Sequence, residues 1–137
     1  MTTDGRLVPT THANRSPDTP AIVMGQTGET VTYAELEDRS CRMARALRAR
    51  GLAVGDHVGI LMENNPAYLV VAWAAQRSGL HYTAINSHLG AGEVQYILDD
   101  CGATALVASA AVADVVDGLD LSRVDDVLPS SILPERA

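Results

Sequence analysis

Short apolar runs of strand length alternate with segments of helical periodicity along most of this chain. Parallel strands need a crossover between them, usually a helix, so this alternation predicts an α/β fold with right-handed crossovers. We therefore predict a partial, doubly wound, mostly parallel sheet with helices on both faces. The expected strands are residues 58–62, 80–85 and 104–108, and the expected helices are residues 33–50, 66–78, 93–100 and 111–119.

The first long helix carries its own start and stop signals. Thr32 and Glu35 have the spacing of a capping box, in which each side chain bonds a free amide at the helix start. Gly51 supplies the stop. One face at helical spacing should be buried, and it comprises Leu36, Ser40, Met43, Ala44 and Leu47. Ahead of this helix, residues 21–24 and 30–33 are β-prone and predict a small N-terminal β-hairpin.

Composition divides the chain into three parts. Residues 1–19 are polar and aperiodic, and predict a flexible leader. Residues 20–121 form the expected α/β portion. Residues 122–137 contain two prolines and predict an irregular tail. Within the α/β portion, the helix expected over 66–78 is apolar nearly all round, so it should be largely buried together with Trp73.

Charge and residue usage exclude several classes of function. The net charge is −7 and the acidic residues dominate the last third, so nucleic-acid binding is not expected. All basic residues are Arg, and without Lys neither Schiff-base chemistry nor a phosphate-loop lysine is available. Cys41 and Cys101 are isolated, which indicates reduced thiols. The longest apolar run, residues 67–75, is too short to span a bilayer. We expect a cytoplasmic chain without a membrane span.

Motifs for other chemistries are missing or incomplete. Gly90 and Gly92 begin a dinucleotide fingerprint, but Gln95 stands where its third glycine belongs. The four histidines, at positions 12, 57, 81 and 88, lack the spacing of metal ligands. The Arg side chains at 39, 42, 45 and 48 indicate the solvated face of a helix. The sequence therefore assigns no catalytic residue and no metal ligand. A stand-alone small-molecule enzyme is not expected, because no nucleophile, base and electrophile converge in the sequence.

Three stretches in succession resemble the opening of adenylate-forming (AMP-binding) acyl-CoA synthetases, including the fatty-acid–CoA ligases. They are TYAEL, GLAVGDHVGILMENNPAYLVVAWAAQRSG and AINSHLGAGEVQYILDDCGATALVAS, and the resemblance covers residues 17–109. It implies a ligase that forms an acyl-adenylate from a carboxylate and ATP, then an acyl-CoA. It also implies ATP, Mg and coenzyme A for the full-length enzyme. The phosphate loop with its Lys, the adenine and ribose contacts and the catalytic Lys should lie beyond residue 137, so this chain should hold no cofactor and be inactive alone.

The resemblance points to one candidate contact. Many members read Asn-x-Arg-Leu where this chain has Asn86, Ser87, His88 and Leu89. In some relatives that Arg faces the nucleotide phosphates of coenzyme A. His88 is then a candidate for a weaker, pH-dependent phosphate contact, because a neutral imidazole carries no charge. The alternative is an ordinary exposed loop histidine.

Two hypotheses remain for the whole chain. In the first it is the N-terminal fragment of a fatty-acyl or related carboxylate–CoA ligase, whose partner is the missing C-terminal part of the same enzyme. In the second it is a complete, non-enzymatic α/β interaction module. A sheet that stops part-way leaves a strand edge unpaired, so the fragment is expected to self-associate into a dimer or larger oligomer. A monomer that unfolds cooperatively would favour the complete module instead.

Overall fold

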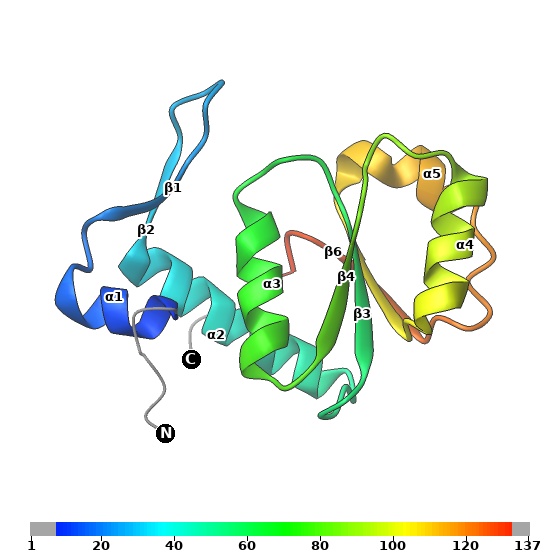
Figure 1. The fold of residues 1–137 in the computed structure, drawn as a ribbon, viewed down its shortest axis with the longest axis horizontal. Helices are drawn as coiled ribbons and strands as arrows, with labels where there is room; N and C mark the ends of the chain where they lie inside the picture. The colour runs from blue at the N-terminus through cyan, green and yellow to red at the C-terminus, as the bar shows by residue number, and fades with distance from the viewer. Residues whose placement is uncertain (1–7, 133–137) are drawn as a thin grey trace.

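A four-stranded parallel sheet forms the centre of the computed structural model, which describes residues 8–132 (Figure 1). Its strand order is β4-β3-β5-β6, with β3 (His57–Leu61) and β5 (Ala105–Ala108) inside and β4 (His81–Ile85) and β6 (Asp126–Pro129) at the edges. A separate antiparallel hairpin pairs β1 (Pro20–Val23) with β2 (Thr30–Thr32). The predicted α/β class, parallel sheet and N-terminal hairpin are confirmed.

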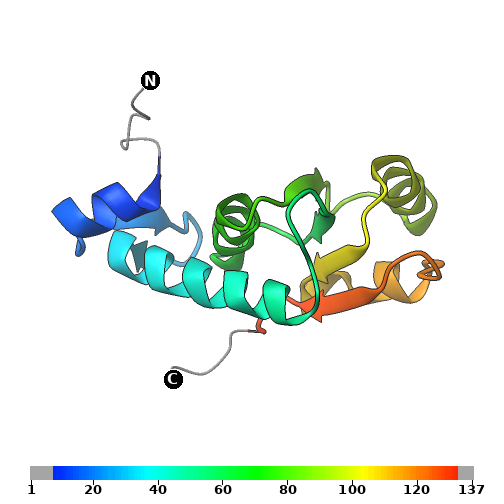
Figure 2. The same cartoon turned by 90° about the horizontal axis from the view of Figure 1, so that it is seen from below.

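Helices cover both faces of the sheet (Figure 2). On one face α2 (Tyr33–Ala49) and α3 (Ala67–Arg77) enclose one apolar cluster, and on the other α4 (Ala91–Cys101) and α5 (Ala113–Asp117) enclose a second. Side chains of the inner strands alternate between these clusters, because successive residues of a strand point to opposite faces. The molecule is therefore layered helix, sheet, helix.

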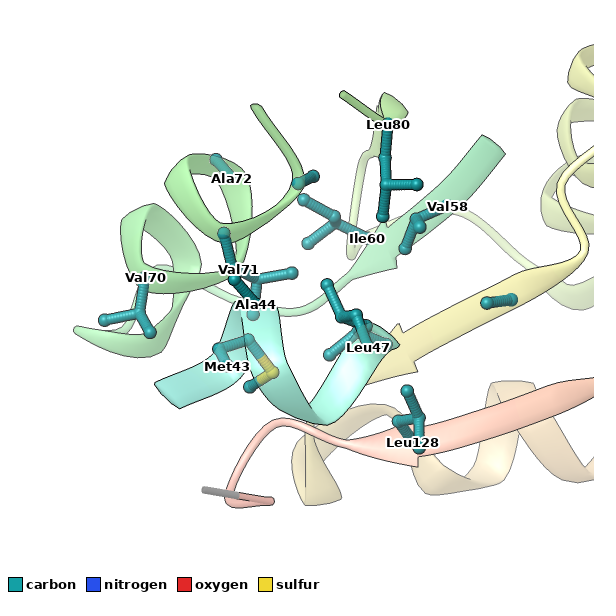
Figure 3. Packing of buried hydrophobic residues seen from close by; sticks show 14 of the residues in the cluster. Met43, Ala44, Leu47, Val58, Ile60, Val70, Val71, Ala72, Leu80 and Leu128 are labelled. Atoms are coloured by element: carbon teal, nitrogen blue, oxygen red, sulfur yellow. The ribbon is translucent and has the colours of Figure 1, made fainter. Parts of the chain in front are cut away.

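The capping signals act as the sequence predicts. Thr32 Oγ1 accepts from the Glu35 amide and Glu35 Oε1 accepts from the Thr32 amide, each at 3.2 Å. The chain leaves α2 through Gly51, whose φ of 90° favours glycine. The five residues expected on the buried face are all buried. Figure 3 shows Met43, Ala44 and Leu47 of α2 packed beside α3 and the sheet.

The expectation for α3 is only partly met. Asn65 Oδ1 accepts a hydrogen bond from the Ala67 backbone amide at 2.8 Å and so caps the helix. However, only one side of α3 packs against the sheet and α2. On its other side Leu69 is 42% exposed, and Trp73 is only partly buried. A helix that is apolar nearly all round is therefore half-buried here rather than enclosed.

The leader expected over residues 1–19 contains a helix, α1 (Pro9–Arg15). Pro9 begins this helix and is buried, while Thr10 Oγ1 donates to Glu37 on α2 at 2.9 Å. The His12 ring lies 5.0 Å from the Tyr33 ring. The helix has only seven residues and no apolar period of its own, so contacts with α2 stabilise it. The prediction of a loose segment was wrong for these residues, and residues 1–7 lie outside the described part.

The tail expected to be irregular over residues 122–137 contains a strand, β6. Its residues pair with β5 from Ala105↔Asp126 to Ala108↔Pro129. Four residues are too few to show a period, and the strand forms because β5 offers its free edge. Pro129 is tolerated because β6 lies at the edge of the sheet. Residues 133–137 lie outside the described part.

Candidate functional site

The candidate site lies where the carboxyl ends of β3, β4 and β5 meet. β3 leads into α3 on one face of the sheet, whereas β5 leads through a 3-10 turn (Ala110–Val112) into α5 on the other. The connections therefore leave β3 and β5 in opposite directions. In open α/β sheets such a reversal opens a crevice at the carboxyl ends, and ligands bind there.

Glu63 and Ser109 bridge the two strands at this reversal. The Ser109 hydroxyl donates to Glu63 Oε2, and the side-chain amide of Asn65 donates to Glu63 Oε1 through Nδ2 at 3.1 Å. The Ser109 amide also donates to the Leu61 carbonyl at 3.2 Å. Ser109 is buried, and its hydrogen bond holds the pKa of Glu63 below the usual 4.5, against the opposing effect of burial. Glu63 is therefore an anion at neutral pH.

Two open hollows lie on either side of Glu63. One, of about 450 Å³, lies over the ends of β3 and β4. The other, of about 750 Å³, lies between the β1–β2 hairpin and the loop that precedes α3. Glu63 and Asn64 line both. The carboxyl edge of the sheet is thus hollowed on both sides of one carboxylate.

His88 lies on the rim of the first hollow. It follows β4 in an exposed loop, where its backbone amide donates to Asn86 Oδ1 at 2.9 Å. Asn86 and Ser87 line the same hollow. The structure thus brings the predicted contact residue to the carboxyl edge of the sheet, in company with Glu63 and Tyr68.

The other histidines lie away from this edge. His57 and His81 begin β3 and β4 at the amino ends, where their ring centroids are 6.0 Å apart. His57 Nε2 is 2.6 Å from Thr83 Oγ1. Within residues 8–132, no group of three His, Cys, Asp or Glu side chains has the arrangement of a metal site. In the same part of the chain, no helix is both long enough and apolar enough to cross a membrane.

Sequence reasoning missed Glu63 and Ser109. Each follows directly after an expected strand, residues 58–62 and residues 104–108. That position is a usable signal, because the residue after a parallel strand lies at the carboxyl edge. What the sequence did not reveal is that these two strands are neighbours.

Ser109→Ala is expected to lower the free energy of unfolding by about 1 kcal/mol at pH 7, because it removes a hydrogen bond to a charged but partly exposed carboxylate. Folding lowers the pKa of Glu63, so the ionised carboxylate stabilises the folded state fully above pH 4.5. This stabilisation is lost as the pH falls through the pKa that Glu63 has in the folded protein. The difference between the two proteins should shrink below pH 4.5. Urea unfolding at several pH values measures it.

Ser131→Ala, at an exposed serine, is the control and should change stability little at any pH. A Ser109→Ala effect that stays the same from pH 7 to pH 3 would show that the serine acts through packing rather than through Glu63.

Comparison with known proteins decides the family. Residues 10–135 match the family model of AMP-binding enzymes. The chain belongs to this family. Among curated relatives, a feruloyl-CoA synthase of Amycolatopsis sp is 37% identical over 116 residues, which are 85% of this chain and 23% of the relative. The long-chain-fatty-acid–CoA ligase FadD13 of Mycobacterium tuberculosis is 35% identical over 107 residues, 78% of this chain and 21% of that enzyme.

Solved structures of the family have the same fold. A fatty acyl CoA synthetase of Mycobacterium tuberculosis superposes with a TM-score of 0.81 at 31% identity, over 88% of this chain and 25% of that chain. The N-terminal domain of FACL13 from the same organism gives 0.83 at 30% identity, over 94% of this chain and 34% of that chain. This member of the family thus corresponds to the N-terminal region of its relatives and spans about a quarter of their length.

Proposed function

We propose that the chain is the N-terminal part of a ligase that joins a carboxylate, of the fatty-acyl or a related class, to coenzyme A. The observation that carries this proposal is the agreement with the FACL13 N-terminal domain over 94% of the chain, combined with its similarity to acyl-CoA-forming relatives. In the whole enzyme the carboxylate attacks ATP to give acyl-adenylate and pyrophosphate. The thiol of coenzyme A then displaces AMP to give the thioester.

This portion serves as scaffold in the proposed enzyme. It has no Lys to hold the transferring phosphates and, among its described residues, no cluster of metal ligands. Its contribution is the ordered carboxyl edge that the Glu63–Ser109 bridge holds in place. ATP and Mg are assigned to sequence that this chain does not contain. Cys41 and Cys101 are free, which fits a reducing compartment, and we place the enzyme in the cytoplasm.

His88 is the proposed contact for a phosphate of coenzyme A. The fit is limited, because the anionic Glu63 lines the same hollow and opposes a phosphate there. His88 is exposed on the rim, so a phosphate is proposed to contact it from the solvent side, with greater affinity when the imidazole is protonated.

A chimera tests the proposal. The matching N-terminal segment of the Mycobacterium tuberculosis ligase is replaced by residues 10–135 of this chain, and carboxylate-dependent exchange of pyrophosphate into ATP is measured. A folded chimera should retain exchange, because the nucleotide and metal sites come from the host. The 137-residue chain alone should give only the rate of a protein-free blank. Exchange by the chain alone, or a folded chimera without exchange, contradicts the proposal.

The same chimera separates the two half-reactions at His88. His88→Ala should leave pyrophosphate exchange unchanged and weaken coenzyme A binding by no more than about tenfold, the size of one hydrogen bond. A slower exchange with unchanged thioester formation would place His88 in the first half-reaction instead.

We also propose that the chain self-associates. The four-stranded sheet has two strands at its edges, β4 and β6, and each has one neighbour among the described residues. Unpaired edges of this kind favour pairing with another chain. Light scattering coupled to size exclusion measures the mass in solution, and a strictly monomeric chain contradicts this proposal.

A further inference from the structure

The two edges of the sheet differ in the backbone groups that they turn outward. In a parallel strand, alternate residues direct both their N–H and C=O groups to the same side. On β4 the His81 backbone amide donates to the Asp56 backbone carbonyl, beside β3, at 2.9 Å. The backbone groups of His81 therefore face β3, and those of the alternate residues Tyr82 and Ala84 face away from the sheet. On β6 the Ser130 amide donates to Ala108 of β5 at 3.0 Å, so Pro129 faces outward.

Edge β6 is protected against further pairing. Pro129 has no N–H to donate, and proline on the outward side of an edge strand prevents strand addition. Asp126 begins the same strand and forms an ion pair with Arg50 at 3.6 Å. A charged residue and a proline thus occupy the two ends of a four-residue strand.

Edge β4 has no such protection. Its sequence, His-Tyr-Thr-Ala-Ile, contains neither proline nor a carboxylate, Lys or Arg. His81, Tyr82 and Ala84 are exposed, and Tyr82 is 41% exposed despite its size. Figure 1 shows β4 with only β3 beside it, and Figure 2 shows it between α3 and α4 at the rim of the sheet. An uncharged edge of this kind accepts a strand readily.

We propose that β4 pairs antiparallel with β4 of a second copy of this chain, about a twofold axis at Thr83. This inference rests on the self-association proposed above and assigns it to one surface. The axis lies perpendicular to the sheet, so each Tyr82 faces Ala84 of the second copy. The outward N–H and C=O groups of both residues are then satisfied across the interface.

The strand is self-complementary in this register. Tyr82 and Ala84 lie on the same face, so a large side chain of each copy packs against a small one of the other. Thr83 opposes Thr83 and His81 opposes Ile85, so no two carboxylates or guanidinium groups are brought together within the paired strands. Because β6 is blocked, the sheet formed by residues 8–132 offers no second open edge on which the assembly could grow. A closed dimer results, not a fibre.

The test is a disulfide at the axis. Opposed residues of a non-hydrogen-bonded antiparallel pair have Cα atoms about 4.5 Å apart, within reach of a disulfide. In a Cys41→Ser, Cys101→Ser background, Thr83→Cys should cross-link almost completely into a dimer on mild oxidation. Val127→Cys is the matched control, since Val127 is 40% exposed on β6. It should remain uncross-linked.

A second pair of variants tests the backbone. Ala84→Pro removes an outward N–H, and Ala84→Lys places a charge on the edge, as natural edge strands do. Each should halve the mass measured by light scattering while leaving the far-ultraviolet circular dichroism unchanged. If the proline variant does not fold, the lysine variant alone decides.

The outcomes distinguish self-association of the chain from its assignment to the β4 edge. Cross-linking at Val127→Cys, or a dimer that persists in a folded Ala84→Lys variant, overturns the β4 interface but retains self-association. A wild-type chain that stays monomeric at high concentration overturns both and assigns the β4 edge to a different partner. The ligase proposal is tested separately, by the chimera.

Discussion

Leu47→Ala is expected to lower the free energy of unfolding by about 3 kcal/mol, within the range of roughly 2–5 kcal/mol for such truncations. Leu47 has no exposed surface, and it belongs to the cluster formed by α2, α3 and the inner strands. Figure 3 shows it directed from α2 into this cluster. Packed neighbours on rigid elements relax little, so the truncation leaves a cavity in addition to the lost apolar contact.

Thermal unfolding should show the effect as a drop in Tm of about 10 °C for a domain of this size. Leu69→Ala is the control, because Leu69 is 42% exposed on α3 and its truncation should lower stability by about 1 kcal/mol at most. Both variants are compared at one protein concentration, since association makes Tm depend on concentration. Equal losses for the two leucines would show that α2 does not pack as described.

Elements with local signals were predictable from the sequence. Thr32, Glu35 and Gly51 mark the ends of α2, and the structure has the capping box and the glycine stop at these positions. The uninterrupted apolar run over residues 58–62 predicted a strand covered on both faces, and β3 is the buried inner strand. In both cases the signal that predicts the element lies in residues close in sequence, although the contacts that bury β3 come from distant segments.

Elements that depend on distant partners were not predictable. Helix α1 is stabilised by contacts with α2, including Thr10 to Glu37, and strand β6 forms on the free edge of β5. Neither segment is long enough to show a periodic pattern of apolar residues. Their residues read as leader and tail because the contacts that order them join positions far apart in the chain.

The candidate site likewise has a part that was predictable from the sequence and a part that was not. His88 was found through a family resemblance, and the structure adds its place on the rim of a hollow. The Glu63–Ser109 bridge joins residues 46 positions apart and exists because β5 returns beside β3. Strand order decides that adjacency, and alternation of strands and helices along the chain does not specify which strands are neighbours.

Gly59→Leu is expected to destabilise the fold by about 3 kcal/mol or more, or to prevent folding, because it overfills the cluster beneath α4. Gly59 is buried in β3, between two residues that point to the opposite face. A Cβ atom at this position would lie 3.1 Å from Leu98 Cδ2 and 3.2 Å from Leu106 Cδ1. Those side chains can yield slightly to a methyl group, but not to a whole isobutyl group in a close-packed layer.

Gly25→Leu is the matched control, because Gly25 lies in the hairpin loop with no atom within 4 Å of an added Cβ and does not have a positive φ. Its substitution should change stability little. Soluble yield and urea unfolding of the two variants measure the difference. If Gly59→Leu were as stable as the wild type, α4 would have to lie farther from β3 than the structure places it. The glycine would then owe its position to something other than the close approach of helix and sheet.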